Sequence, residues 1–362
     1  MFNLAEYIWV DGTQPDPILR SKSRVVHFPK GKEISIGDFP GWSFDGSSTC
    51  QAPGNYSDCL LKPVNFVRDP IRGEGNYLVL CEVLLPDGEP HSTNTRSKLR
   101  RVLEAGGAAH EPWIGFEQEY TMFEGASPLG WPKNGYPAPQ GPYYCSAGTG
   151  RVVGRELVER HTRACLDAGI MLYGINAEVM YAQWEYQIGY RGVAAESADV
   201  LNVSDHLIMA RWLMERLSEE FGITISLAPK PVKGDWNGAG NHSNFSTKEM
   251  RDPATGQRTI EASIERLRSA HQLHIKNYGF GLAERLTGAH ETCHIDEFRS
   301  GRSDRGASIR IPAQVAIDGY GYIEDRRPAA NCDPYLVSAL LVNTVCDIGV
   351  ELADEARSPV LV

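Results

Sequence analysis

The sequence predicts a mixed α and β fold in two parts, and three observations support this. The chain has 362 residues, and at about 100–200 residues per domain this length suggests two domains. Residues 1–90 contain short apolar runs separated by Gly, Pro and Asp, which is typical of strands and turns. Further along, strand-like runs alternate with amphipathic stretches of helical length. This order fits an α+β or an α/β domain and leaves open whether the sheet is parallel.

In the first part, strands are expected at residues 6–10, 25–28 and 77–85. A polar turn at residues 41–49 follows aromatic side chains. The composition shifts around residues 91–95, and a helix is expected to begin at Thr95. We therefore predict a small domain at residues 1–92 and a larger domain at residues 93–362.

The larger part is expected to alternate helices with strands. Ser204 or Asp205 would cap the clearest helix, and Asp333 followed by Pro334 would cap the last one. Glycines follow three of the predicted helices and act as stop signals. The expected helices span residues 155–168, 205–221, 261–278 and 334–348, and the expected strands span residues 113–123, 175–181, 184–188, 223–227 and 307–311.

Composition excludes several classes of function. With 42% hydrophobic and 23% charged residues, the chain is ordinary for a globular protein. The net charge is −10 and no basic patch stands out, so we expect no nucleic-acid partner. No apolar leader follows Met1 and no stretch is long enough to span a bilayer, so we expect no membrane partner. The eight cysteines contain no C-x-x-C pair, which favours a cytoplasmic protein with reduced, buried thiols.

Two carboxylates one residue apart are the most informative local feature. Glu117 and Glu119 lie in a run rich in aromatic and apolar residues, which predicts a largely buried strand. Alternating side chains on a strand share a face, so both carboxylates would point the same way. Buried like charges are costly unless a cation lies between them. A divalent metal ion with oxygen ligands meets this requirement.

Other segments offer further ligands for such an ion. Glu178, Glu185 and Glu324 each lie in strand-like surroundings rich in apolar and aromatic residues. His242 follows glycines that would let a ligand approach the backbone closely. Each acid alone could form a salt bridge or face solvent. Together, five acids and one histidine could hold two ions such as Mg²⁺ or Mn²⁺.

Arginines cluster in the same third of the chain as Glu324. Their forked guanidinium groups suit carboxylates and phosphates. The chain contains no G-x-x-x-x-G-K-[ST] pattern. Metals and arginines without that pattern suggest phosphoryl transfer at a nucleotide site of another kind. The arginines are Arg285, Arg305, Arg310, Arg326 and Arg327.

One pattern points elsewhere and is set aside. His290, Glu291 and His294 match H-E-x-x-H, the pattern of zinc proteases. That pattern binds zinc only on a helix, where both histidines share a face. A glycine precedes it here, and Thr292 and Cys293 are poor helix formers. We expect a mobile, acid-bearing loop instead.

Taken together, these motifs resemble those of the type II glutamine synthetases, from one end of the chain to the other. Several long motifs in the right order are far more specific than one metal pattern. They are FDGSST at 44–49, EQEYT at 117–121, PQGPYYC at 139–145, INAEVM at 175–180, KPVKGDWNGAGNHSNFSTK at 230–248, RLTGAHET at 285–292, DRGASIRIP at 304–312 and YIEDRRPAANCDPY at 322–335.

The resemblance implies a role for each matching position. The implied first metal set is Glu119, Glu178 and Glu185, and the second is Glu117, His242 and Glu324. The implied catalytic residues are Asp45, Glu291, Arg305 and Arg326, where Asp45 comes from a neighbouring subunit and Glu291 belongs to a flap. The implied substrate-binding residues are Arg285, Gly238, Tyr144 and Ser48. The implied nucleotide-binding residues are Trp113, Ser246, Arg251, Arg310 and Tyr322.

The resemblance also implies fold, reaction and assembly. The expected fold is a small β-grasp N-terminal domain beside a catalytic domain with a curved antiparallel sheet and surrounding helices. The expected ligase converts glutamate, ammonia and ATP into glutamine through a γ-glutamyl phosphate, using two or more Mg²⁺ or Mn²⁺ ions. This would place it in nitrogen metabolism. The expected assembly is a ring homo-oligomer, a decamer of two pentamers, with active sites between subunits.

Departures from the family pattern keep alternatives open. Tyr181 and Tyr190 each stand where the family usually has proline. They motivate a second hypothesis, in which a specialised ligase acts on a glutamate analogue or on an amine instead of ammonia. A third hypothesis is a catalytically silent structural ring. The presence of all six expected metal ligands and of the arginines argues against it.

Overall fold

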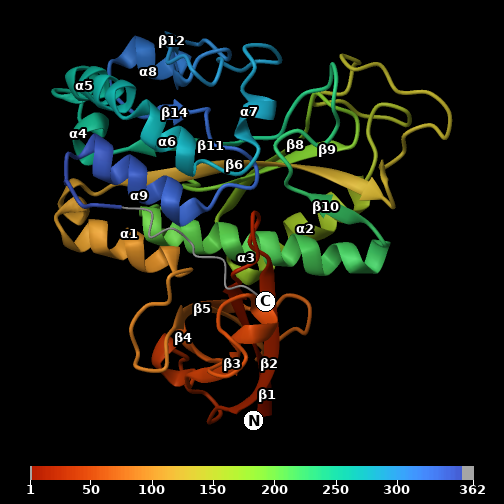
Figure 1. Ribbon diagram of the computed structural model, residues 1–362, viewed down its shortest axis with the longest axis vertical. Helices are drawn as coiled ribbons and strands as arrows, with labels where there is room; N and C mark the ends of the chain where they lie inside the picture. Colours follow the sequence, from red (N-terminus) through yellow and green to blue (C-terminus); the bar gives the residue numbers. More distant parts are fainter. Residues whose placement is uncertain (1, 353–362) are drawn as a thin grey trace.

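A five-stranded sheet forms the small part of the molecule (Figure 1, red and orange). The protein is described by a computed structural model that covers residues 2–352. Strand β1 pairs in parallel with β5, and the other neighbours are antiparallel, in the order β2-β1-β5-β4-β3. The strands are β1 (Phe2–Val10), β2 (Leu19–His27), β3 (Trp42–Asp45), β4 (Asp58–Arg68) and β5 (Tyr77–Leu84).

Strand β5 shows why this sheet packs on the rest of the molecule. Its side chains alternate between two faces. Val79 and Cys81 belong to the core of the small part, whereas Leu78 and Leu80 belong to the main core. A strand buried on both faces has a nearly continuous apolar sequence, which is why the pattern at residues 77–85 predicts this strand. Strand β4 was not predicted, because its apolar residues are interrupted by polar ones and by Pro63.

A second, nine-stranded sheet forms the centre of the larger part. Its main path runs β12-β13-β14-β11-β6-β9-β8, while β7 and β10 pair with β6. The pairs are antiparallel except for β12 with β13, so the predicted curved antiparallel sheet gains one parallel pair. The strands are β6 (Trp113–Glu124), β7 (Ser127–Pro128), β8 (Leu172–Ala177), β9 (Gln183–Ile188), β10 (Thr224–Ser226), β11 (Asn241–Ser246), β12 (Ser300–Arg302), β13 (Ile309–Ile311) and β14 (Ile323–Asp325).

Helices cover the larger sheet, and α3 lies between it and the small part (Figure 1). Helix α3 packs against β6, β9 and β10 on that side. The helices are α1 (Thr95–Glu104), α2 (Arg155–Ala168), α3 (Val200–Ser218), α4 (Lys248–Arg251), α5 (Gly256–Ser269), α6 (His271–Asn277), α7 (Leu282–Arg285), α8 (Ala313–Asp318) and α9 (Pro334–Val345). The boundary between the two domains, expected after residue 92, stays a prediction.

Two helix predictions are corrected by the structure. Helix α3 begins at Val200, not at residue 205, because Asp199 caps it by accepting hydrogen bonds from the Leu201 and Asn202 amides. Asp199, Ser204 and Asp205 are all capping residue types, and only tertiary contacts choose between them. The helix expected at residues 261–278 is two helices that meet at Ala270, where the backbone turns to φ −95° and ψ 11°.

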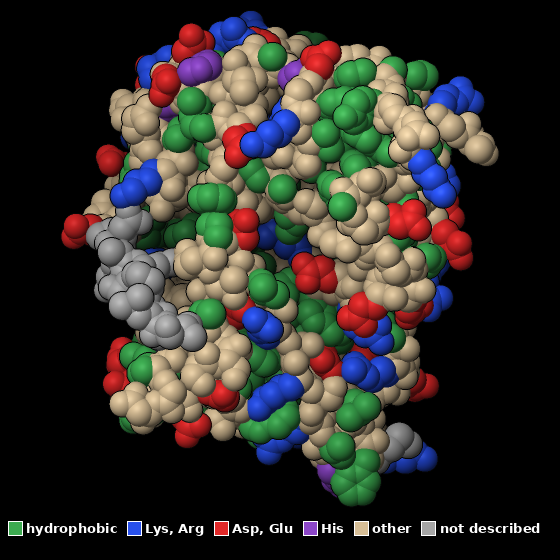
Figure 2. All heavy atoms as spheres, turned by 45° about the vertical axis from the view of Figure 1, so that its right-hand side comes forward, with side chains coloured by type: hydrophobic (Ala, Val, Ile, Leu, Met, Phe, Trp, Pro, Cys, Tyr) green, Lys and Arg blue, Asp and Glu red, His purple; other side chains and the backbone are tan. Residues whose placement is uncertain are grey.

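The surface agrees with the composition. On the face drawn in Figure 2, Lys and Arg side chains are interspersed with Asp and Glu. Within residues 2–352, no helix is long and apolar enough to cross a bilayer. All eight cysteines are free thiols, and five of them are buried.

Candidate active site

Cross-strand pairing brings the predicted metal ligands to one face of the larger sheet. Glu117 of β6 lies opposite His242 of β11. Glu119, two residues later, lies opposite Glu185 of β9. Side chains opposite each other on antiparallel strands lie on the same face, so these four groups converge.

The neighbouring strands add the next acid and its cations. Glu324 of β14 lies opposite Arg310 of β13, and the two side chains form an ion pair. Arg326 also donates to Glu324, at 2.6 Å. The Glu324 side chain is fully buried. Two guanidinium groups therefore offset the cost of burying this carboxylate.

A cavity of about 220 Å³ opens on this face. Within the described residues, two sets have ligand atoms within 4.8 Å of one another: Glu117 with His242 and Glu324, and Glu119 with Glu185 and His242. The set of Glu117, His242 and Glu324 has the same residues as the predicted second metal group. Glu178 lines the cavity but lies outside both sets. The cavity is lined by Glu117, Glu119, Tyr144, Asn176, Glu178, Val179, Glu185, Gln187, His242, Glu291, Arg305, Arg310 and Arg326.

Burial, together with repulsion between the carboxylates, raises the pKa values of three of these acids. Burial, with the Glu117 charge next, raises the pKa of Glu185 to about 10. Burial and the Glu119 charge raise the pKa of Glu178 to about 8. The pKa of Glu119 rises to about 7 through burial, which the nearby Arg285 partly offsets. A bound cation would stabilise these crowded carboxylates, and carboxylate oxygens with one imidazole suit Mg²⁺ or Mn²⁺.

Neutral amides, which the sequence motifs did not single out, orient the acids. Asn176 donates to Glu178 at 2.7 Å, and Gln187 donates to Glu185 at 2.6 Å. Asn244 donates to Glu117 at 2.8 Å. Each amide lies two positions from an acid or from His242, and Gln187 and Asn244 share a strand face with Glu185 and His242. That spacing is the signal that could have found them. Groups of this kind hold metal ligands in position.

Arg285 lies beside the cavity and does not line it. Its guanidinium group donates to the carbonyl of Arg326 at 3.0 Å and to Nε2 of His242 at 2.9 Å. Gly238 packs against it so closely that an added Cβ would lie 2.8 Å from its Cγ. Two of the four residues expected to bind substrate, Arg285 and Gly238, are therefore neighbours beside the acidic cavity.

The loop that carries the H-E-x-x-H pattern is not helical. His290 and Glu291 both have positive φ, at 52° and 61°, which a helix excludes. His290 lies 3.3 Å from Asp235, and His294 lies 3.6 Å from Asp296. Glu291 lines the acidic cavity. The expectation of a loop is confirmed.

A second cavity, of about 340 Å³, has aromatic walls. The rings of Trp113 and Tyr190 lie 4.9 Å apart. Cζ of Arg251 lies 4.1 Å from the Trp113 ring centre, and Arg251 donates to Oγ of Ser246 at 2.9 Å. Tyr322 completes the wall. Four of the five predicted nucleotide-binding residues meet here, whereas Arg310 lines the acidic cavity.

Asp45 and Ser48 lie in the small part, outside the acidic cavity of their own chain. Asp45 is exposed and accepts hydrogen bonds from both hydroxyls of Ser47 and Ser48, at 2.6 and 2.7 Å. With the Ser47 hydroxyl as the largest contribution, these bonds lower the pKa of Asp45 to about 2. The structure thus presents an ionised carboxylate on the surface of the small part.

Comparisons with known proteins show which proteins this sequence and fold resemble. Residues 1–86 match the model "Glutamine synthetase, beta-Grasp domain", and residues 92–264 match "Glutamine synthetase, catalytic domain". The chain is 53% identical to a chloroplastic glutamine synthetase of Chlamydomonas reinhardtii, over 94% of this chain and 90% of that protein. It is 54% identical to a glutamine synthetase of Streptomyces viridochromogenes, over 94% and 96%. A cryo-EM structure of Plasmodium falciparum glutamine synthetase has the same fold, with a TM-score of 0.73 at 18% identity, over 95% of this chain and 72% of that one.

Proposed function

Because the chain belongs to the glutamine synthetase family and carries its catalytic domain, it is a glutamate–ammonia ligase, and we propose how its residues perform the reaction. The reaction activates the γ-carboxylate of glutamate with ATP and displaces phosphate with ammonia, which gives glutamine, ADP and phosphate. The convergence of five acids and one histidine on one sheet face carries the proposal.

Enzymes of this family use ATP and divalent metal ions, and the acidic cavity suits them. We assign Glu119, Glu178 and Glu185 to one ion and Glu117, His242 and Glu324 to a second ion. Bound Mg²⁺ or Mn²⁺ would neutralise charge on the transferred phosphoryl group. His242 is suited to a ligand role because burial, with the nearby Arg326 charge, keeps its pKa well below the ordinary value. A neutral imidazole is the form that binds metals.

Arginines would complete the charge balance during phosphoryl transfer. Arg305 and Arg326 line the cavity, where they would stabilise the transferred group and the acyl phosphate. Arg285, with Gly238 beside it, would hold the α-carboxylate of glutamate. Tyr144 also lines the cavity, on the side of Glu178.

Ammonium is not a nucleophile, so a carboxylate must bind it and take its proton. An ionised Asp45 binds a cation well, and Ser48 fixes the carboxylate. Burial against a neighbouring subunit would raise the pKa of Asp45 and make it a better proton acceptor. Glu291 would close the flap over the acyl phosphate and exclude water.

The aromatic cavity is the proposed site for ATP. Trp113, Ser246, Arg251 and Tyr322 would surround the base and sugar, with Tyr190 as an added aromatic wall. Arg310 lines the acidic cavity and would contact the phosphates. Strand β11 borders both cavities, since Asn244 lines the aromatic cavity and His242 lines the acidic one.

We infer ring assembly because Asp45 lies in the small part and does not line the acidic cavity of its own chain. A site that needs Asp45 is complete only between subunits, and we propose a decamer of two pentamers in the cytoplasm. Exposed aromatic rings favour association. Trp131, Tyr136 and Trp236 form a cluster in which Tyr136 is 75% exposed. The mass of the native assembly tests this number.

The specialised-ligase hypothesis gains no support from the two altered positions. Tyr181 is buried against Tyr143, with ring centres 5.1 Å apart, and it does not line the acidic cavity. Tyr190 lines the aromatic cavity. Neither lies at the proposed glutamate or ammonium sites.

Phosphate release with a panel of acids and amines tests the proposal. We expect the highest turnover with glutamate and ammonium. Turnover with another pair, and none with glutamate and ammonium, would establish the specialised ligase instead. No turnover with any pair, together with an intact ring, would favour a structural role.

A further inference from the structure

A single buried arginine on α3 is bound to the back of the catalytic strand. Arg211 is 8% exposed and lies on the sheet face opposite the acidic cavity. Its Nε and Nη2 donate to Oε1 of Gln118, at 2.8 and 2.5 Å. Gln118 stands between Glu117 and Glu119 on β6, and its side chain points to the other face.

The same guanidinium group also holds the segment that follows β14. Nη2 donates to the carbonyl of Ala330 at 3.0 Å, and Nη1 donates to the carbonyl of Cys332 at 2.9 Å. Gln118 repeats the link, since its Nε2 donates to the Ala330 carbonyl at 3.0 Å and to the Glu119 carbonyl at 2.9 Å. These bonds join β6 to the chain that leaves Glu324 and Arg326.

Four bonds from one group to three acceptors require the planar fork of arginine. Lysine offers a single point charge on a flexible stem and cannot reach three diverging oxygens at once. The side chain does not pair with an acid, because its partners are an amide and two carbonyls. Glu215, one turn further along α3, lies near enough that the Arg211 charge partly offsets the rise in its carboxyl pKa caused by burial.

We propose that Arg211 is a positioning residue for the metal site, which it controls through Gln118. A shift of Gln118 would move Glu117 and Glu119 together, and these belong to different metal groups. The inference rests on the proposed metal site, and Mg²⁺ binding can be measured without any turnover. Failure of the ligase assay with wild-type protein would therefore be distinct from failure of this inference.

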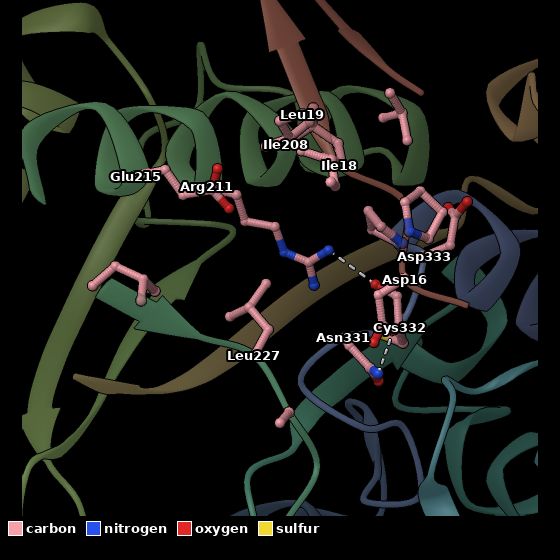
Figure 3. A pocket seen from close by; sticks show the side chains of 15 residues that line it. Asp16, Ile18, Leu19, Ile208, Arg211, Glu215, Leu227, Asn331, Cys332 and Asp333 are labelled. Carbon is pink, nitrogen blue, oxygen red and sulfur yellow. Dashed lines mark hydrogen bonds between the residues drawn. The ribbon is translucent and has the colours of Figure 1, made fainter. Parts of the chain in front are cut away.

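A cavity beside Arg211 offers space for a small cation, which makes a chemical-rescue experiment feasible. Its volume is about 230 Å³, and its walls come from the β1–β2 connection, α3, the chain after β10 and residues 331–334. Figure 3 shows Arg211 crossing the cavity toward Cys332, while Asn331 reaches Asp16. Apolar side chains of Ile18, Ile208 and Leu227 line the rest. Free guanidinium ion could enter this space when the arginine is shortened.

The first measurement compares Mg²⁺ binding to wild type and to Arg211→Met, which keeps the length and removes the fork. We expect Mg²⁺ affinity to fall by about 10–100-fold, the usual effect of removing a group that orients metal ligands. Gln118→Leu should give the same loss. The double variant should lose no more Mg²⁺ affinity than either single variant, because both changes break the hydrogen bonds between Arg211 and Gln118.

The control separates positioning from stability. Arg96 is also largely buried and forms ion pairs at 2.8 Å with Glu82 and Asp205, which lie on β5 and α3. Arg96→Ala should lower the unfolding temperature and leave Mg²⁺ affinity unchanged. If Arg211→Met behaved like Arg96→Ala, Arg211 would be only structural and the proposal would be wrong.

Chemical rescue gives a readout that a structural role would not move. We expect millimolar guanidinium to restore Mg²⁺ affinity to Arg211→Ala at least several-fold, whereas ammonium should not. Guanidinium should not restore Glu119→Ala, which lacks the metal ligand itself. Rescue of neither variant, or of both variants alike, would contradict the assignment.

Discussion

At the scale of single residues, the acidic face combines charge that must be neutralised with donors that hold it in place. Glu117 and Glu119 point to one side of β6, where His242 and Glu185 lie opposite them. The amides of Asn244 and Gln187 bind the acids without adding charge. The face therefore keeps an excess of negative charge for metal ions.

Removing one acid should remove activity. We expect Glu119→Ala to reduce turnover by at least about 10²-fold, because a first metal ligand is lost. Glu124→Ala, on the exposed end of the same strand, is the matched control and should keep wild-type turnover. Equal activity of the two variants would exclude Glu119 from the metal site. Phosphate release with glutamate and ammonium provides the measurement.

Mg²⁺ affinity should rise with pH. In the metal-free protein, the pKa values of Glu119, Glu178 and Glu185 are raised to about 7, 8 and 10, so protons compete with the ion. The raised values also mean that the metal-free protein loses stability as pH rises above about 4.5. Calorimetry in buffers of different ionisation enthalpy should detect proton release on Mg²⁺ binding near pH 7. An affinity that does not change between pH 6 and 8 would contradict these shifts.

Tyr190 should contribute to nucleotide affinity. Its ring lies against Trp113 and is 42% exposed in the aromatic cavity. We expect Tyr190→Ala to raise the KM for ATP by about three- to tenfold, because an aromatic contact of this kind contributes about 0.5–1.5 kcal/mol. The kcat should change little. The KM for glutamate should stay unchanged, because Tyr190 does not line the acidic cavity.

At the scale of elements, caps and breaks decide where the helices lie. Asp199→Ala should destabilise the start of α3 by about 1 kcal/mol, because the Leu201 and Asn202 amides lose their acceptor. Hydrogen exchange of these two amides should accelerate by about fivefold. Asp199→Asn keeps an acceptor and should stay close to wild type. Exchange that is unchanged in Asp199→Ala would show that the cap contributes little.

At the scale of the whole molecule, the proposed site needs two subunits. Asp45→Ala and Glu119→Ala should each be almost inactive as homogeneous rings. Asp45→Ala should still form the acyl phosphate and should fail mainly in amination. Dissociated and reassembled mixtures of the two variants should regain activity, because some interfaces then pair an intact small part with an intact acidic face. Mixtures that stay inactive would place Asp45 outside the neighbouring site.

Much of the site could be predicted from the sequence. The alternation of Glu117 and Glu119 fixes their common face by backbone geometry, and the long motifs identify their partners. The H-E-x-x-H pattern was correctly assigned to a loop from its glycine and poor helix formers. These inferences depend on neighbours within a few residues, where local rules are strong.

What the sequence alone determined is the chemistry of the acids, the mixed α and β class and the family. Only the tertiary structure decided which residue caps α3 and where the helix near Ala270 breaks. It also decided that Arg211 binds Gln118, which lies 93 positions earlier in the chain. It also placed Arg310 with Glu324 and Tyr181 away from the cavities. The physical reason is that caps, breaks and long-range hydrogen bonds each change the free energy by only about 1 kcal/mol. Contacts between distant segments, which no local pattern records, decide among choices of that size.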